Sequence, residues 1–178
     1  MKYRGYRVDV VGAVALLTVA LLLTGRLAYT RYLVEKPLVR ELKALPGVQG
    51  VELGQEHGRY VIRLELTQAA NLAEVYRKAE QTSGESLGQG RFELKIIDKR
   101  SPELEDLYYR LHYYVEEALV RGNFSEAAAR IESVAQAAGV KEKLYVDRGH
   151  VYIELSQGQH FLYEVRERPV ATAGGEPA

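Results

Sequence analysis

The side chains best suited to binding or chemistry are four tyrosines and one histidine within Leu107–Tyr114. The apolar residues around this run repeat at helical spacing and define an inward face, so Tyr109, His112 and Tyr113 point to the opposite side. Tyrosine offers rigid amphipathic contact area and is enriched at protein interfaces. We therefore predict an interaction surface at these three residues. The alternative is that this helix lies between two modules and is covered on both sides.

Metal-binding residue types do not converge in the sequence. The four histidines, His57, His112, His150 and His160, lack the HxxxH, HxH or HExxH spacing that brings ligands together. Cysteine is absent, so no disulfide, thiolate site, cysteine nucleophile or lipid-modified cysteine can be proposed. We expect surface histidines, no metal and no other cofactor.

Motifs for catalysis or phosphate binding are also missing. The glycine-rich segment Ser83–Gly90 follows a predicted helix rather than a strand and lacks the Lys-Ser/Thr pair of a P-loop. Serines occur without a GxSxG or SxxK pattern, and carboxylates are spread over exposed faces. We expect a flexible connector at 83–90 and a protein that is not an enzyme.

The charge balance argues against nucleic-acid binding. The chain has 24 basic and 24 acidic residues, and from Lys36 onward there are 19 basic and 22 acidic residues. Contacts to a phosphate backbone need clustered Lys and Arg, whereas the charges here alternate in sign.

A hydrophobic stretch near the N-terminus predicts a transmembrane helix over residues 8–28. Its uncharged part, Val10 to Gly25, covers about 24 Å at about 1.5 Å per residue, which is short for a hydrocarbon core of about 30 Å. Arg26 can snorkel at one end, and Tyr6 and Tyr29 occupy positions typical of an aromatic belt. With these flanks the span is long enough.

The span also predicts a location. Residues 1–7 form a basic tail typical of the cytoplasmic end of a signal anchor, followed after the span by a juxtamembrane linker at 29–36. The body is then extracytoplasmic, in a bacterial envelope. A cleaved signal peptide is the alternative, but Arg26 and Tyr29 lie where a cleavage site needs small residues.

The sequence predicts two α+β modules in the body. Residues 37–98 predict helix, strand, strand, helix, strand, with Pro46-Gly47 ending the first helix, a turn at His57-Gly58, and the second helix between Asn71 and Gly84. Residues 101–168 predict a helical hairpin, opened by Ser101-Pro102 and by an Asn123/Glu126 capping box, and a three-stranded β-meander. The tail, 169–178, has too little apolar content to fold and is predicted to be disordered.

The element order of residues 37–98, with Leu45-Pro46-Gly47-Val48 before a strand and a membrane span upstream, resembles ring-building motifs and BON domains. The resemblance implies an extracytoplasmic module attached to an envelope, and for ring-building motifs side-by-side packing into rings. It assigns no functional residue.

We therefore expect a non-catalytic, membrane-anchored component that binds another protein or itself. The second hypothesis is a ligand-binding or sensory envelope module that uses the cleft between the two halves, and the third is an undetected hydrolase.

Overall fold

The computed structural model describes residues 2–3 and 6–168, and it describes side chains from residue 10 onward except at positions 23 and 26–31. The tail at 169–178, predicted to be disordered, and part of the basic tail at 1–7 lie outside the described residues. The described chain is a mixed α+β fold with two three-stranded sheets, as predicted. Two short strands, β1 (Lys2–Tyr3) and β2 (Tyr6–Arg7), pair in front of it.

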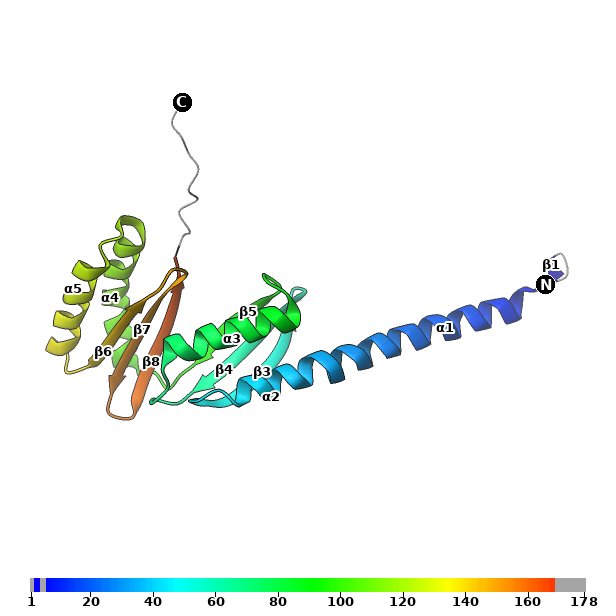
Figure 1. Cartoon of the computed structure of the whole chain (residues 1–178), viewed down its shortest axis with the longest axis horizontal. Helices are drawn as coiled ribbons and strands as arrows, with labels where there is room; N and C mark the ends of the chain where they lie inside the picture. Colours follow the sequence, from blue (N-terminus) through cyan, green and yellow to red (C-terminus); the bar gives the residue numbers. More distant parts are fainter. Residues whose placement is uncertain (1, 4–5, 169–178) are drawn as a thin grey trace, which may run out of the picture.

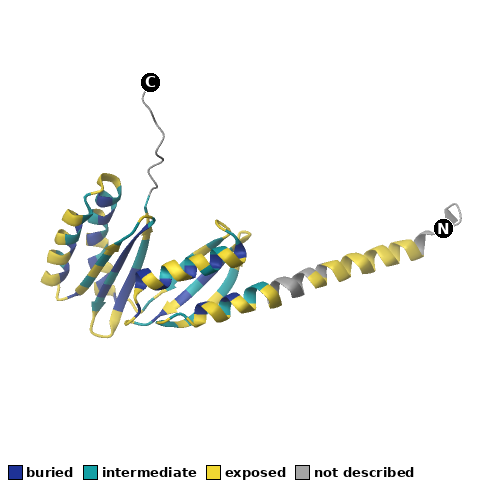
Figure 2. Cartoon of the chain, viewed as in Figure 1, coloured by how far each residue is buried: buried dark blue, intermediate teal, exposed yellow. Residues whose placement is uncertain are grey.

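A long helical segment follows and projects away from the folded body (Figure 1). It consists of α1 (Val8–Tyr29), the π-helical turn η1 (Thr30–Glu35) and α2 (Lys36–Lys43). Every described side chain of α1 is exposed (Figure 2). Over the residues available to such a search, no helix reaches both the length and the apolar character needed to cross a membrane.

The segment 29–36, predicted as a juxtamembrane linker, has helical backbone. It contains no glycine or proline that would interrupt a helix. Pro37 lacks the N–H that would bond to the Leu33 carbonyl, and its ring needs space at that point, which the wider π-helical turn just before it supplies. The helix is therefore unbroken up to α2, which buries Leu38 and Leu42 in the body.

The first sheet contains β3 (Val48–Glu56), β4 (Arg59–Leu66) and β5 (Phe92–Ile97), in the order β3-β4-β5. β3 is antiparallel to β4, and β5 is parallel to β4 after the crossover helix α3 (Leu72–Leu87). Ile62, Leu64 and Leu66 of β4 are buried with residues of α2 and α3, as their alternation predicts. Gly47, in the turn between α2 and β3, has φ 86°, and a Cβ there would lie 2.6 Å from the Cβ of Ala70.

Helix α3 extends further than predicted. We expected it to end before Gly84, yet it continues to Leu87 and ends at Gly88, so the predicted connector is partly helical. Buried Ser83 and Leu87 continue the inward stripe at helical spacing. A Cβ at Gly84 would collide with the Gln89 side chain, so glycine here lets the chain fold back against the helix.

The second sheet lies under two helices. α4 (Pro102–Arg121) and α5 (Phe124–Ala137) precede β6 (Lys141–Val146), β7 (His150–Gln157) and β8 (His160–Glu167), which pair antiparallel in sequence order. The hairpin and the meander are present as predicted. The capping box is not, because the Asn123 amide donates to the Glu126 carboxylate at 3.2 Å and makes no side-chain cap to the backbone.

Both faces of the second sheet are covered, and this joins the two halves. Val151, Ile153 and Leu162 pack with α4 and α5, whereas Tyr152 and Tyr163 pack with residues of the first half. The Phe161 N–H also donates to the Lys99 carbonyl at 3.0 Å, which links the end of the first sheet to β8. Figure 2 shows the buried residues on either side of this shared sheet.

Candidate functional site

Helix α4 carries the residues that the sequence singled out. The Ser101 hydroxyl accepts the Leu104 N–H at 3.4 Å at its start, and Gly122 ends it at φ 74°. Five apolar residues four or three positions apart are buried along one side: Leu104, Leu107, Leu111, Val115 and Ala118. This stripe fixes α4 against the second sheet and turns the opposite side of the helix to solvent.

The exposed side bears Tyr109, His112 and Tyr113, which we call the tyrosine face. Tyr109 is 65% exposed and Tyr113 is 58% exposed, so the alternative of a helix covered on both sides is wrong. The ring centroids of His112 and Tyr113 lie 3.9 Å apart, and those of Tyr109 and His112 lie 5.2 Å apart. The structure therefore brings the three predicted residues together as one aromatic surface.

Hydrogen bonds hold these rings in place on the helix. The Tyr113 hydroxyl lies 3.5 Å from the Tyr109 hydroxyl, and this bond raises the pKa of Tyr113. The His112 Nδ1 is hydrogen-bonded to the Tyr109 carbonyl. Because the rings contact each other, less side-chain entropy remains to be lost when a partner binds.

A groove of about 350 Å³ borders the tyrosine face on the side of β8. Tyr108, Tyr109 and His112 of α4 line one wall, and Leu162, Glu164 and Arg166 line the other. Burial raises the pKa of Tyr108 to about 12, so its phenol stays protonated at neutral pH. The groove thus offers aromatic edges and a neutral hydroxyl next to the exposed rings.

Charges around this groove are paired with one another. Arg166 lies 2.6 Å from the Glu116 carboxylate, and Arg100 lies 3.4 Å from Glu164 and 3.9 Å from Glu105. Burial raises the pKa of Glu164, and Arg100 partly offsets this. With its cations already neutralised, the groove has no surplus positive charge for a free anion.

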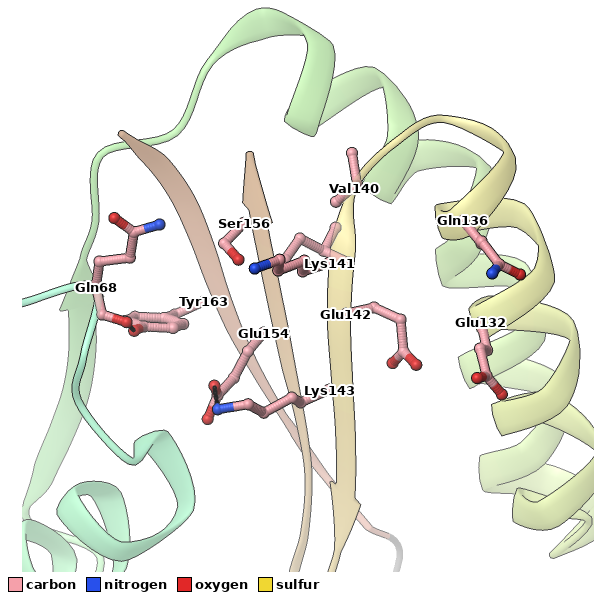
Figure 3. A pocket seen from close by; sticks show the side chains of 11 residues that line it. Gln68, Glu132, Gln136, Val140, Lys141, Glu142, Lys143, Glu154, Ser156 and Tyr163 are labelled. Carbon is pink, nitrogen blue, oxygen red and sulfur yellow. Dashed lines mark hydrogen bonds and ion pairs between the residues drawn. The ribbon is translucent and has the colours of Figure 1, made fainter. Parts of the chain in front are cut away.

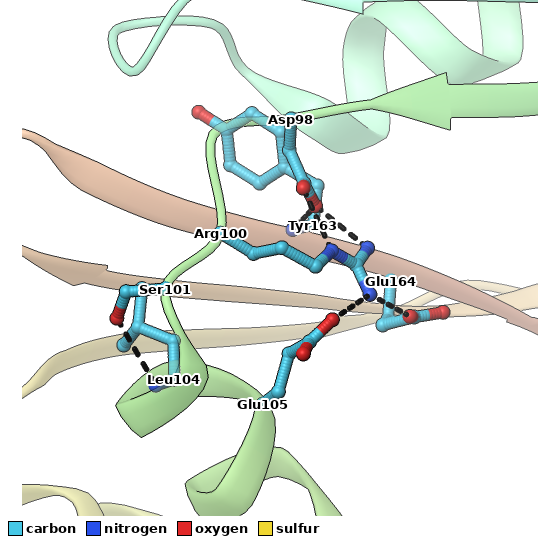
Figure 4. Close-up of polar contacts among 7 residues, drawn as sticks. All are labelled: Asp98, Arg100, Ser101, Leu104, Glu105, Tyr163 and Glu164. Carbon is cyan, nitrogen blue, oxygen red and sulfur yellow. Dashed lines mark hydrogen bonds and ion pairs between the residues drawn. The ribbon is translucent and has the colours of Figure 1, made fainter.

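Arg100 also connects the site to the junction between the halves (Figure 4). Its guanidinium makes two hydrogen bonds of 2.8 Å to the Asp98 carboxylate, which in turn accepts the Tyr163 N–H at 2.8 Å. The Asp98 side chain is only 3% exposed. The segment between β5 and α4 is therefore locked to β8, which fixes where α4 begins.

The cleft between the halves is a second candidate site. It contains a groove of about 530 Å³. Gln68, Glu142 and Lys143 are among the side chains that line this groove (Figure 3). A neighbouring groove of about 630 Å³ continues along β6 as far as Tyr145. Lys143 lies 3.4 Å from Glu154, whose carboxylate also accepts the Leu72 N–H at 3.2 Å.

Burial raises the pKa of Glu142, and nearby Glu132 adds to this. The cleft thus contains both acidic and basic side chains along β6, the edge strand of the second sheet, and some of them form ion pairs. Within the part of the chain that the structure describes, no three His, Cys, Asp or Glu side chains could hold a metal ion together.

The histidines differ from the prediction at one position. His57 and His160 are exposed, and His112 lies in the tyrosine face. His150 is only 8% exposed, so its assignment to the surface is wrong. It lies between β7 and α3, with its ring 5.1 Å from Tyr76 and its Nε2 3.6 Å from Glu80.

Sequence reasoning missed the residues that border the tyrosine face. Arg100, Glu164 and Arg166 come from the junction and from β8, far from α4 in the chain. Alternation in β8 places Glu164 and Arg166 on the same side as Leu162, which packs toward α4. That alternation was a usable signal, whereas Arg100 gave none.

No protein-family model matches this chain, and no curated protein matches it at a significant level. The resemblance of residues 37–98 to ring-building motifs and BON domains therefore rests on element order and the Pro-Gly-Val turn.

Proposed function

We propose that this chain is a non-catalytic, single-pass membrane protein whose extracytoplasmic body binds a protein partner, either another protein or a second copy of itself, through the tyrosine face. The observation that carries the proposal is the distribution of exposed large apolar side chains among the described residues. Eight lie on α1, two in η1 and three on α4 (Tyr109, Tyr113 and Val120), whereas Ile97 and Tyr145 are isolated. Clustered apolar exposure marks membrane or protein contacts, and isolated residues do not.

The anchor is supported by the character of α1. Its exposed residues include Leu16, Leu17, Leu21 and Leu22, each at least 67% exposed. The uncharged stretch from Val10 to Gly25 supplies the apolar residues that favour insertion. A helix with apolar residues on all sides suits lipid better than water.

The continuous helix favours an anchor over a cleaved signal peptide. Helical backbone runs through 26–36, where a protease would need an extended segment with small residues. Leu38 and Leu42, on the same continuous helix, belong to the core of the body. The helix therefore fixes the body close to the membrane surface.

The tyrosine face supports the binding role. Aromatic residues contribute strongly to interfaces, and here a shallow groove and paired charges surround them, as in the polar rim of an interface. The body faces away from the cytoplasm in this proposal because Lys2, Arg4 and Arg7 precede the span.

Two measurements on the full-length chain in its own membrane test the proposal. Protease added outside the cytoplasmic membrane should digest the body, and survival of the body in intact cells would contradict the orientation. A photoreactive residue in place of Tyr113 should cross-link a protein, whereas the same residue in place of exposed Ser133 on α5 should not. Equal cross-linking at both positions would contradict a specific surface.

The cleft supports a second candidate, a ligand-binding or sensory module. The specific observation is that the grooves of about 530 and 630 Å³ take residues from both halves. A small molecule bound there should raise the melting temperature of the full chain, and Lys143→Glu should remove the effect. A melting temperature that stays unchanged across ligand classes would count against this candidate.

A further inference from the structure

We propose that the partner of the tyrosine face is a second copy of this chain, docked with the two α4 helices antiparallel about a two-fold axis at Tyr113. The inference deepens the proposed function and rests on its claim that this face binds protein. It is carried by the placement of charged and polar residues on the two sides of Tyr113.

Helical spacing of about 100° per residue places these residues around Tyr113. Arg110, one turn before, and Glu117, one turn after, lie about 60° and 40° to one side. Tyr109 and Glu116 lie about 40° and 60° to the other side. Each side therefore has one hydrogen-bond donor in the turn before Tyr113 and one carboxylate in the turn after it.

A two-fold axis perpendicular to the plane of the two helices makes them antiparallel. It places the turn before Tyr113 opposite the turn after Tyr113 of the second copy. Residues on one side of the helix then face residues from the same side of the second copy. Arg110 then faces Glu117 of the second copy, and the reverse contact forms as well. On the other side the Tyr109 hydroxyl faces the Glu116 carboxylate of the second copy. All four contacts join a donor to an acceptor.

A parallel arrangement has the opposite result. Arg110 would face Tyr109 of the second copy, so two donors would meet, and Glu117 would face Glu116, so two carboxylates would meet. The charge pattern of α4 therefore selects the antiparallel orientation.

The present contacts leave these groups available. Arg110 is exposed and makes no ion pair within the described part of the chain. Glu117 pairs with Arg121 at 2.7 Å and with Arg130 at 3.9 Å, and its side chain remains 34% exposed. Such exposed pairs are weak, so Glu117 can share its carboxylate with a third cation.

The apolar part of the face is small, and membrane attachment compensates for this. Tyr113 lies at the centre, and Val120, 86% exposed, extends the apolar line by two turns. Two anchored copies share one membrane, so their effective concentration is high and weak contacts suffice.

Cross-linking of the full-length chain in phospholipid vesicles tests the orientation, and the absence of native cysteine makes single-cysteine variants clean. Asp106 and Val120 lie seven residues on either side of Tyr113, which is about 10.5 Å along the helix. In the antiparallel dimer each therefore faces the other residue of the second copy, whereas two copies of Asp106 are about 21 Å apart.

A short bis-maleimide linker should join Asp106→Cys chains to Val120→Cys chains when the two variants are mixed. Vesicles that contain one variant alone should give little product. Cross-linking of each variant to itself, or no cross-linking in the mixture, would overturn the proposal.

Charge reversal tests the pairing in the same vesicles. Arg110→Glu alone and Glu117→Arg alone should each lower the mixed cross-link about tenfold, because two symmetric pairs become repulsive. The double variant should restore it, and Arg59→Glu in the first half should leave it unchanged. Failure of the double variant to recover, with its melting temperature unchanged, would contradict the pairing.

The photoreactive residue at position 113 separates this inference from the proposed function. Cross-linking to a different protein and not to itself would overturn the second-copy assignment and leave the binding surface in place. Cross-linking to no protein would overturn both.

Discussion

Two sets of tyrosines occupy contrasting positions in this molecule. Tyr152 and Tyr163, at 1% and 3% exposed, lie between the halves, and their hydroxyls are bonded to Asp147 at 2.8 Å and to the Thr67 carbonyl at 2.9 Å. Tyr109 and Tyr113 are exposed, and their hydroxyls contact each other at 3.5 Å. The inner set has fixed protein partners, whereas the outer set lies next to solvent.

This difference shows that a helical or alternating pattern predicts on which side of its element a residue lies, but not whether another part of the chain covers that side. Both sets sit on the side of their element opposite to the α4–β7–β8 core, so local sequence places them equally outward. The second sheet is then covered by the first half, and α4 is not covered on its outer side. We infer that the inner tyrosines serve stability and the outer ones serve contact.

The largest effect should come from Tyr163. Truncating it to alanine removes an aromatic ring that packs with Phe161 at 5.2 Å and the hydroxyl that bridges Thr67 and Gln68. We expect Tyr163→Ala to lower the free energy of unfolding by about 3–5 kcal/mol. Denaturant unfolding of the full chain in detergent measures this. Tyr113→Ala is the matched control, with an expected change within about 0.5 kcal/mol, and equal losses would break the comparison.

A smaller loss is expected from Asp98→Ala. The substitution leaves the Tyr163 N–H without its acceptor and removes both bonds from Arg100. Because the Arg100 side chain is 33% exposed and keeps Glu164 as a neighbour, we expect a cost of about 2–3 kcal/mol rather than that of a fully buried pair. Glu105→Ala is the control, since it lies 3.9 Å from Arg100 at the exposed end, and a similar cost for both variants would contradict the role of Asp98.

Asp147→Asn should lower the free energy of unfolding by about 1–2 kcal/mol and change how that free energy depends on pH. Burial opposes its ionisation, but hydrogen bonds from Tyr152, His150 and Gly149 outweigh this and lower its pKa below 3.8. A lowered carboxyl pKa adds stability that is fully present well above pH 3.8 and is lost progressively as the pH falls through 3.8 toward the lower folded value. Asp147→Asn should therefore reduce the acid-induced loss below that pH in thermal unfolding. An unchanged acid profile would contradict the assignment.

Much of this fold could be predicted because local signals agree with it. Ser101-Pro102 and Gly122 mark the two ends of α4, and alternating apolar residues mark β4. The outward position of Tyr109 and Tyr113 followed from helical spacing alone. Such features depend on neighbouring residues, which a sequence displays directly.

The contact between the halves could not be predicted in the same way. His150 was expected at the surface because it follows a turn, and only the packing of α3 on β7 buries it. A signal did exist in Val151–Ile153 and Phe161–Tyr163, where consecutive apolar residues indicate strands covered on both faces. Which element covers the second face depends on long-range packing, so no local pattern identifies it.

The double variant Tyr109→Ser/Tyr113→Ser tests the central claim most directly, in the full chain reconstituted in vesicles with the 106–120 cysteine pair. Serine removes both rings from an exposed surface, so we predict a melting temperature within about 2 °C of the parent and a mixed cross-link reduced more than tenfold. A large fall in melting temperature with cross-linking retained would show that these tyrosines serve the fold and would contradict the account.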